Sequence, residues 1–471
     1  MTGTMVHEQW SSRFVFLMAA IGSAVGLGNV WRFPFITGEN GGGAFILIYL
    51  VTMAAIALPI LMAEIMLGRM GGKSPINSII AVARQHKKSV LWAVMTWGGT
   101  LGGFFVLSYY SVIGGWALKY TGLAVSGTFA GIEGAASEQL FGSFIADPAG
   151  LALWHTLFMA INVGIIVGGL RKGIERAVVF MMPLLFLLLV GLVVYAASTP
   201  GFSAAVEFLF TFDFSKVTPN TFLLAIGQGF FSVSVALGAM MAYGAYLDKS
   251  VSIPSSAVMI AIADTGVAIL AGLAIFPLVF SFALEPSAGP GLVFVTVPVA
   301  FGQMEAGLIV GSMFFLLLSV AAITSAISLL EPAVAYMEES TRFSRRSAAL
   351  TVGGVCWFVG LASAFSFNDW SAFYPLAVLG VLEGKTVFDV LDFVATSWVQ
   401  PGVGIMMAVF VGWVLSRDTV MEALNMNGAA PAWFGVWYFL VRIVCPLAVL
   451  IIFASAVWPD FVTGLLGGMG E

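Results

Sequence analysis

Long apolar runs separated by short polar segments occupy most of the chain. Eleven of these runs are nearly free of charge and long enough to span the ~30 Å hydrocarbon core of a bilayer as helices. They cover residues 14–36, 44–68, 89–118, 148–169, 177–198, 219–247, 254–283, 306–337, 347–367, 390–416 and 433–457. The first run lacks a signal-peptide cleavage pattern and is too long for one. The pattern therefore predicts an all-α polytopic membrane protein with eleven transmembrane helices in a single domain over residues 1–471.

Two of the runs are interrupted by residues that a lipid-facing helix does not need. The first contains GSAVGLGN at Gly22–Asn29, and the sixth contains QGFFSVSVALG at Gln228–Gly238. Glycine costs about 1 kcal/mol relative to alanine inside a helix, and lipid tolerates loose backbone only where it is buried in protein or lines a cavity. One explanation of these small residues is that they permit close packing of an unbroken helix. Asn29 inside the first interruption instead favours a broken helix that exposes carbonyls and amides to an ion or a charged substrate.

The two interrupted runs occupy corresponding positions in two halves of the chain. Runs one to five make up residues 14–198, and runs six to ten make up residues 219–416. Because each half has an odd number of spans, the second half enters the membrane from the opposite side. This predicts an inverted 5+5 repeat with broken helices 1 and 6, an arrangement that indicates a transport site at the membrane midplane. The run at 433–457 lies outside the repeat.

Charge sets the orientation of the spans and narrows the class of function. Only 9% of the residues are charged. If the N-terminus is cytoplasmic, fourteen of the 19 Lys and Arg residues lie in cytoplasmic segments. The positive-inside rule therefore predicts a multi-pass protein of the cell's inner (plasma) membrane, with the N-terminus cytoplasmic and the C-terminus outside. No basic patch suits a nucleic acid, and no obligate protein partner is evident. Motifs such as HExxH, GxSxG and Walker A are absent, so we do not expect an enzyme.

Three polar residues within the runs are candidates for ion chemistry. Asp264 is taken as the only acid deep inside a span, where a carboxylate costs about 2.5–3.5 kcal/mol. No Lys or Arg lies deep in spans one to ten, so a bound cation or a proton is the expected partner. Thr324 and Ser325 are adjacent hydroxyls in the eighth span; such hydroxyls often bond carbonyls of their own helix, but hard oxygens are also what a small alkali cation needs. Cys356 and Cys445 lie in apolar runs, so neither a disulfide nor a metal cluster is expected.

Further polar positions suggest substrate contacts and gates. Tyr110 places a phenol inside the third span, where it can donate to an anionic group. Arg32 and Asp392 would each be costly alone near the outer side, so a pair that closes an outer vestibule is plausible. Gly173 and Pro183 bracket the inner end of the fifth span, and we expect this segment either to kink or to unwind and admit water.

These motifs together resemble the neurotransmitter:sodium symporter family, in particular its bacterial amino-acid transporters. The resemblance is carried by Trp10-x-x-Arg13, GSAVGLGNVWRFP (Gly22–Pro34), ENGGGAFILIY (Glu39–Tyr49), RKGIER (Arg171–Arg176), Gln228–Ser234 and Ala321–Pro332, and it spans runs one to ten. It implies the inverted-repeat fold known from the bacterial leucine transporter.

The resemblance also implies a set of binding residues. One sodium ion would bind Ala24, Asn29, Ser232 and Asp264, and a second would bind Gly22, Val25, Ala321, Thr324 and Ser325. The amino-acid substrate would contact Ser23, Ala24, Leu27, Gly28, Val106, Tyr110, Phe231, Ser232, Ser234, Leu237, Ser325 and Leu329. The outer gate would consist of Arg32 and Asp392, and the inner gate of Trp10, Tyr246 and Glu339.

Several positions depart from the family pattern. Gly26 stands where carriers of monoamines have an acid, which favours a zwitterionic amino acid. Asp264 stands where Asn is usual and Ala268 where chloride-dependent members have Ser, so Asp264 is expected to replace the charge of chloride. His7 stands where an inner-gate Arg is usual, and the common twelfth span is missing. Leu237 occupies a position that is Phe in the leucine transporter, which makes room for larger side chains.

The sequence therefore predicts a sodium-coupled, chloride-independent symporter that imports neutral hydrophobic amino acids, both aliphatic and aromatic, by alternating access. The alternative is a proton-coupled amino-acid transporter with Asp264 as the proton carrier, although Asn29, Thr324 and Ser325 argue against it because protons need no cage of oxygens. An amino-acid sensor without transport is a weaker possibility, since the short termini offer no output domain.

Overall fold

The computed structural model describes residues 8–282, 292–377, 382–426 and 431–458. In this part of the chain the regular elements are helices, joined by connecting segments, with one isolated β-bridge between Gly42 and Phe212. Within it, nine helices are long and apolar enough to cross a membrane. They are Gly43–Gly71, Val90–Val125, Pro148–Val167, Leu170–Ala196, Ile253–Ser281, Gly307–Ser340, Arg345–Phe365, Val387–Val414 and Ala432–Val457. All nine overlap predicted spans, and His7 lies outside the described residues.

The first predicted span is a bent pair of helices. Helix α1 (Arg13–Ala24) begins after its N-cap Ser12 and ends where Val25 adopts an extended backbone. The chain resumes as the π-helix η1 (Gly28–Arg32) and α2 (Phe33–Glu39), and the two parts are bent by 52°. The glycine-rich segment therefore breaks the helix, as the sequence predicts.

The sixth predicted span is divided into two short helices. Helix α11 (Pro219–Ser232) and helix α12 (Ala239–Ala245) are separated by residues 233–238, which are not helical. Within this segment Ser234, Ala236 and Gly238 have positive φ angles of 50°, 67° and 81°. Left-handed backbone is unfavourable for Ser and Ala, so the surrounding contacts must hold this segment in place. With the nine long helices and the bent pair, α11 and α12 account for all eleven predicted spans.

Several long helices contain short π-helical turns. The second span consists of α3 (Gly43–Thr52), the π-helix η2 (Met53–Ala57) and α4 (Leu58–Gly71). The third consists of the 3-10 helix η3 (Val90–Trp92) and α6 (Ala93–Val125). The fourth span is α8 (Pro148–Val167), and the fifth consists of η4 (Leu170–Glu175) and α9 (Arg176–Ala196). After the divided sixth span come α13 (Ile253–Ser281), α15 (Gly307–Ser340) and α16 (Arg345–Phe365), which are the seventh, eighth and ninth spans. The tenth span consists of α17 (Val387–Phe393), η8 (Val394–Val399), α18 (Gln400–Val409) and η9 (Phe410–Val414). The eleventh consists of α20 (Ala432–Phe439), η10 (Leu440–Val444) and α21 (Cys445–Val457).

The segment around Gly173 is helical in this structure. It forms the π-helix η4, and α9 continues through Pro183 without interruption. A Cβ on Gly173 would lie 2.0 Å from the Ile165 carbonyl oxygen, so the glycine allows the fourth and fifth spans to pack closely here. Unwinding of this segment in another conformation remains a prediction.

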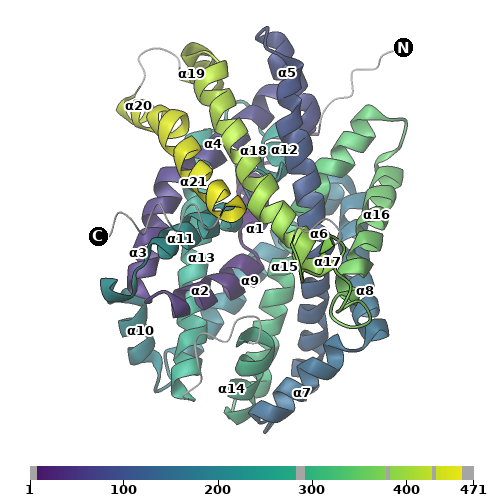
Figure 1. Ribbon diagram of the computed structural model, residues 1–471, viewed down its shortest axis with the longest axis vertical. Coiled ribbons are helices and arrows are strands. Elements are labelled where there is room, and N and C mark those ends of the chain that lie inside the picture. Colours follow the sequence, from purple (N-terminus) through teal and green to yellow (C-terminus); the bar gives the residue numbers. More distant parts are fainter. Residues whose placement is uncertain (1–7, 283–291, 378–381, 427–430, 459–471) are drawn as a thin grey trace.

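Short helices connect the spans at the two ends of the molecule. They are α5 (Pro75–Gln85), α7 (Gly134–Ile145), α10 (Phe202–Phe210), η5 (Phe214–Lys216), η6 (Leu292–Thr296) with α14 (Val297–Gln303), and α19 (Arg417–Ala423). Helices α5, α12 and α19 lie at one end, and α7, α10 and α14 lie at the opposite end (Figure 1). The first end is called here the N-terminal end, because Trp10 hydrogen-bonds there to Tyr243 and Tyr246 at the end of α12.

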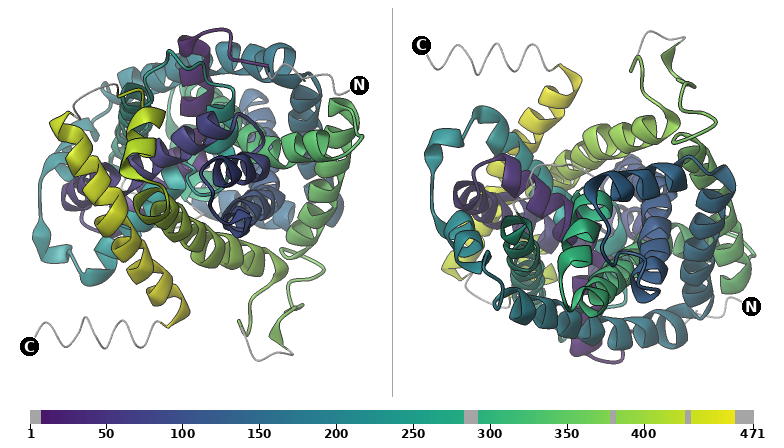
Figure 2. Two further views of the ribbon diagram at one scale, coloured as in Figure 1. Left: turned by 90° about the horizontal axis from the view of Figure 1, so that it is seen from above. Right: turned by 90° about the horizontal axis from the view of Figure 1, so that it is seen from below.

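The interrupted helices lie inside the bundle. Helix α1 contacts α9, α13 and α15, while α15 packs along α6 and α12 packs along α4. The end-on views show the C-terminal helix α21 at the edge of the bundle (Figure 2), where it packs on α18 and α11. Both helix breaks therefore face protein rather than lipid, which satisfies the requirement for irregular backbone at this depth.

Candidate functional site

Asp264, near the middle of α13, lies at the centre of a buried polar cluster. The Asn29 side-chain amide donates to Asp264 Oδ1 across 2.7 Å and to its carbonyl oxygen across 3.1 Å. The Ser232 hydroxyl donates to Asp264 Oδ2 across 2.7 Å and accepts from Asn29 across 3.0 Å. All three side chains are at most 2% exposed. The structure thus brings together the side chains of the first predicted sodium site, from η1, α11 and α13.

Two residues of this cluster were not singled out from the sequence. The Tyr49 hydroxyl donates to Asp264 Oδ2 across 3.3 Å from the second span. The Gln228 amide donates to the Gly28 carbonyl across 3.1 Å, which ties α11 to the first helix break. Both lie inside motifs that carry the family resemblance, and only this place in a motif could have indicated that they belong to the site. A lone polar residue in an apolar run does not reveal which carboxylate it reaches.

A second cluster of oxygens joins α15 to the first helix break. The Ser325 hydroxyl lies 3.3 Å from the Gly22 carbonyl oxygen and 3.2 Å from that of Val25. The Thr324 hydroxyl donates to the Ala321 carbonyl across 3.0 Å. These five residues are the predicted second sodium site, and the hydroxyls and carbonyls that meet here are hard oxygen ligands.

A small cavity lies beside the polar cluster. Its volume is about 20 Å³, room for about one water molecule. It is lined by Ala24, Gly26, Leu27, Gly28, Val106, Tyr110, Phe231, Ser232, Ser234, Leu237, Ser325 and Leu329. Every predicted substrate residue except Ser23 lines this cavity; the Ser23 hydroxyl instead donates to Ser328 across 2.7 Å. An amino acid is larger than the cavity, so its lining side chains must separate to admit one.

Phe231 separates this cavity from a larger one that extends toward the opposite end of the molecule. The larger cavity, called here the vestibule, has a volume of about 370 Å³. Its lining includes Leu27 and Gly28, which it shares with the small cavity, and the predicted gate residues Arg32 and Asp392. Arg32 and Asp392 form no ion pair within 4.0 Å in the part of the chain that the structure describes; the Arg32 guanidinium lies 4.9 Å from the Phe231 ring centroid. The predicted outer gate residues therefore face one cavity without closing it.

The path toward the N-terminal end is closed by aromatic and charged residues. Trp10 donates from its backbone to the Tyr246 carbonyl across 3.1 Å and from its indole to the Tyr243 carbonyl across 2.9 Å. The Tyr246 hydroxyl donates to Glu331 Oε1 across 2.9 Å, and Glu331 also forms an ion pair with Arg345. Trp10 and Tyr246 thus lie where the inner gate was predicted.

Part of this closed region was not predicted from the sequence. The predicted gate residue Glu339 accepts hydrogen bonds from the Ser74 backbone and hydroxyl and from the Asn77 amide. Glu331 and Arg345, which were not proposed as gate residues, form the ion pair beside Tyr246. Arg345 begins α16 and Glu331 lies on α15, so only the fold brings them together.

The expectation that Asp264 is the only acid deep inside a span was wrong. Glu64 on α4 is fully buried, and its Oε2 accepts from the Ala236 backbone amide across 2.9 Å. Glu331 on α15 is 1% exposed. Glu64 therefore helps to hold the left-handed turn at Ala236 in place, while Asp264 is the acid that meets the hydroxyl and amide cluster.

This geometry suits ions and a small polar molecule held between broken helices. A family model described as the sodium:neurotransmitter symporter family matches residues 7–131 and 142–460. The chain belongs to this family. Its members are transporters, so the protein is a transporter and not an enzyme, and it is a multi-pass membrane protein that uses sodium.

Relatives of this symporter cover nearly the whole chain. It is 36% identical over 450 residues to the uncharacterized sodium-dependent transporter YhdH of Bacillus subtilis, covering 95% of this chain and 97% of the relative. It is 32% identical over 464 residues to an uncharacterized sodium-dependent transporter of Haemophilus influenzae, covering 96% and 99%. A crystal structure of MhsT in complex with L-phenylalanine superposes with a TM-score of 0.86 at 40% identity, covering 95% of this chain and 99% of that one. The predicted fold of the leucine-transporter type is thereby confirmed.

Proposed function

We propose that this symporter couples the movement of sodium to the import of neutral, hydrophobic L-amino acids, both aliphatic and aromatic, and that it does not need chloride. The observation that carries this proposal is the arrangement of two oxygen clusters, around Asp264 and around Ser325, on either side of one cavity with mainly apolar walls.

The two clusters suit two sodium ions. Asp264, Asn29 and Ser232, with the Ala24 carbonyl, would hold one ion, and the oxygens of Gly22, Val25, Ala321, Thr324 and Ser325 would hold the other. The hydrogen bonds that now join these oxygens would be replaced by contacts with the ions. Because Asp264 brings its own negative charge to the first site, we infer that no chloride ion is needed to balance the sodium.

The polar end of the cavity suits the carboxylate of an amino acid. The Tyr110 hydroxyl lies 3.3 Å from the Leu27 amide, and the Leu27 and Gly28 amides lie at the start of η1, where the helix dipole favours an anion. A Cβ on Gly26 would lie 2.5 Å from the Ser325 hydroxyl oxygen, so an acid does not fit there without displacement. A zwitterion, which supplies its own carboxylate, is therefore favoured over an amine.

The opposite end of the cavity suits an apolar side chain. Val106, Leu237 and Leu329 line it, and Leu237 lies within the non-helical segment between α11 and α12. A Cβ on Gly102 would lie 3.3 Å from the Leu237 side chain, so the glycine allows Leu237 to pack closely against α6. A larger substrate side chain would therefore have to displace Leu237. The L-phenylalanine bound by MhsT supports an aromatic amino acid among these substrates.

The gates support alternating access in one orientation. We place the N-terminal end in the cytoplasm of the cell, the vestibule outside and the C-terminus outside, in the plasma membrane. Moving one charge through 100 mV contributes about 2.3 kcal/mol, so two sodium ions with a zwitterion gain about 4.6 kcal/mol. At about 1.4 kcal/mol per decade, this supports accumulation of more than about a thousandfold. Protonation of Asp264 on the return step would lower the net charge.

Equilibrium binding of labelled L-phenylalanine to the purified protein tests this function. We expect binding in sodium, its loss in choline, and competition by leucine and tryptophan but not by glycine. Equal binding in both cations would support the proton-coupled alternative, in which Asp264 carries the proton. Competition by glycine as strong as that by tryptophan would contradict the hydrophobic preference.

A further inference from the structure

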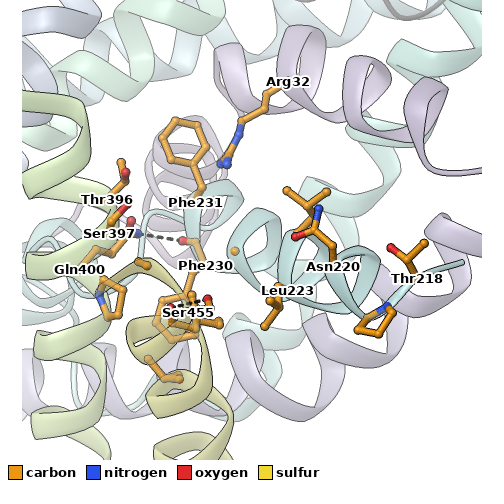
Figure 3. A pocket seen from close by; sticks show the side chains of 17 residues that line it. Arg32, Thr218, Asn220, Leu223, Phe230, Phe231, Thr396, Ser397, Gln400 and Ser455 are labelled. Atoms are coloured by element: carbon orange, nitrogen blue, oxygen red, sulfur yellow. Dashed lines mark hydrogen bonds between the residues drawn. The ribbon is translucent and has the colours of Figure 1, made fainter. Parts of the chain in front are cut away.

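A third cavity lies beside the vestibule and outside the proposed substrate and ion sites. It has a volume of about 570 Å³ and lies between α11 on one side and η8, α18 and α21 on the other (Figure 3). Cavities of this size accommodate small organic ligands. We call it the lateral crevice. Among its lining residues, only Arg32 and Phe231 also belong to the gate or the substrate site proposed above.

The walls of the lateral crevice are mainly apolar and continue to the outer surface of the bundle. Leu223, Leu224 and Gly227 on α11 face Val449 and Ile452 on α21. Neighbouring residues on the same two helices are exposed apolar side chains: Phe222 is 50% exposed and Ile451 is 49% exposed. Since both helices belong to membrane spans, these exposed side chains face lipid. A molecule dissolved in the bilayer therefore reaches the crevice without crossing a polar surface.

The deep end of the crevice carries a positive charge that no carboxylate contacts directly in the described residues. In the described part of the chain, the Arg32 guanidinium has no carboxylate within 4.0 Å and donates no hydrogen bond; its contact is the Phe231 ring at 4.9 Å. Figure 3 shows Arg32 beside this ring at one end of the cavity, with Asn220 and Leu223 across from them. Asp392 acts on Arg32 only across a distance greater than 4.0 Å. An anion in the crevice would instead contact the guanidinium directly, which is favourable for a cation at this depth.

Arg32 lies between the crevice and the vestibule and lines both. Arg32, Phe231 and Thr396 line both cavities, and Asp392 lines the vestibule alone. The Arg32–Phe231 contact is therefore the partition between them. An anion bound to Arg32 from the crevice side competes with Asp392 for the same guanidinium.

We propose that the lateral crevice binds a monoanionic amphiphile from the membrane, a fatty-acid-like molecule whose carboxylate contacts Arg32 and whose acyl chain lies between α11 and α21. The bound carboxylate holds Arg32 away from Asp392 and so keeps the vestibule open. Binding itself does not depend on the proposed transport function, whereas the inhibition of transport that follows from it does.

Gly227 allows a direct test of the acyl-chain site. A Cβ on Gly227 meets no atom within 4 Å and Gly227 lines the crevice, so we expect Gly227→Leu to place its side chain in the crevice. Gly402 on α18 is the matched control, because its Cβ also meets nothing within 4 Å and it lines neither cavity. The probe is radiolabelled dodecanoate, measured by scintillation proximity with the protein in nanodiscs of zwitterionic lipid and with empty nanodiscs subtracted. Dodecanol, as an unlabelled competitor, supplies the same chain without the charge.

We expect Gly227→Leu to weaken dodecanoate binding at least about tenfold and Gly402→Leu to leave it unchanged. Arg32→Gln should weaken it about tenfold, and dodecanol should compete about tenfold less well than unlabelled dodecanoate, because a charge-assisted hydrogen bond is lost in each case. Binding that Gly227→Leu does not change, or dodecanol competition equal to that of dodecanoate, overturns the proposal. Dodecanoate should also slow uptake by the wild type and by Gly402→Leu but not by Gly227→Leu. A protein that binds dodecanoate as described but transports no amino acid would contradict the transport function alone.

Discussion

The Asn29 side-chain amide donates to the Asp264 carboxylate across 2.7 Å and thereby joins the first helix break to the middle of α13. The same amide also donates to Ser232, near the second break. One buried carboxylate is thus connected to both interrupted helices. Anything that changes its charge, whether an ion, a proton or a substitution, acts on both helices at once.

Replacing this carboxylate tests its proposed role as the fixed negative charge. Asp264→Asn keeps the shape but removes the charge, so we expect sodium-dependent uptake to fall at least about tenfold. Ala268 is fully buried one turn further along α13. Adding Ala268→Ser to Asp264→Asn should restore part of the uptake in chloride but not in gluconate. Full activity of Asp264→Asn without chloride would contradict the role assigned to the carboxylate.

Removing one hydroxyl tests the second ion site. Ser325→Ala deletes the oxygen that lies near the Gly22 and Val25 carbonyls. The bound ion would then lose one oxygen contact. Because a contact with a charged group contributes about 1.5 kcal/mol, the sodium concentration for half-maximal uptake should rise about tenfold. The control is Ser328→Ala, since the Ser328 hydroxyl contacts Ser325 and Ser23 but neither carbonyl. An equal effect of the two substitutions would indicate a packing defect instead.

Much of the fold follows from the sequence because the apolar runs are long. A run that must satisfy all its backbone bonds in lipid has few alternatives to a helix, so all eleven predicted spans appear. The short helices α5, α7 and α10 were not predicted, because they lie in connecting segments without that constraint. The exact break in the sixth span, at residues 233–238, depends on contacts such as the bond from the Ala236 amide to Glu64.

Single site residues such as Asp264 and Ser325 could be singled out as polar positions within apolar runs, but their grouping into one site followed from the family resemblance. Asn29, Ser232 and Asp264 lie far apart in the sequence, and the resemblance placed them in one cluster that the structure assembles. Glu331 and Arg345 form an ion pair that no motif indicated. The separation of Arg32 from Asp392 is a property of the conformation, which the sequence does not encode.

The size of residue 237 should control substrate preference. Leu237→Phe adds a ring to a cavity of about 20 Å³, so larger substrates are expected to lose most. We expect the ratio of tryptophan to leucine uptake to fall about tenfold, within the range for steric discrimination in an apolar pocket. Leu237→Met, which nearly conserves volume, is the control. A ratio unchanged by Leu237→Phe would place the substrate side chain elsewhere.

Gly26 is expected to tolerate no side chain. A Cβ at this position would lie 2.5 Å from the Ser325 hydroxyl oxygen and 3.1 Å from that of Tyr110. Gly26→Ala should therefore weaken sodium-dependent L-phenylalanine binding at least about tenfold, since it displaces groups of both proposed sites. Gly164→Ala on α8, where a Cβ meets nothing within 4 Å, should bind as the wild type does. Normal binding by Gly26→Ala would show that these hydroxyls do not contact the ligands.

The ion pair beside Tyr246 should hold the N-terminal end closed. Glu331→Gln removes the buried partner of Arg345 and leaves it only the more exposed Glu338. Removing one partner of a buried pair costs about 3–5 kcal/mol, and Glu338 offsets part of this cost. We expect amide hydrogens of α1 to exchange at least about tenfold faster, measured by mass spectrometry in sodium. Glu338→Gln is the control, because Glu338 lies 3.4 Å from Arg345 and its side chain is 33% exposed. Equal protection of α1 in wild type and Glu331→Gln would remove this pair from the gate.

Uptake into proteoliposomes tests the central claim most directly. Labelled L-leucine and L-tryptophan would be supplied with an inward sodium gradient or with choline, each in chloride and in gluconate. The account predicts uptake of both amino acids that requires sodium and is the same in the two anions. Uptake that persists in choline and follows a proton gradient, or that fails in gluconate, would contradict it.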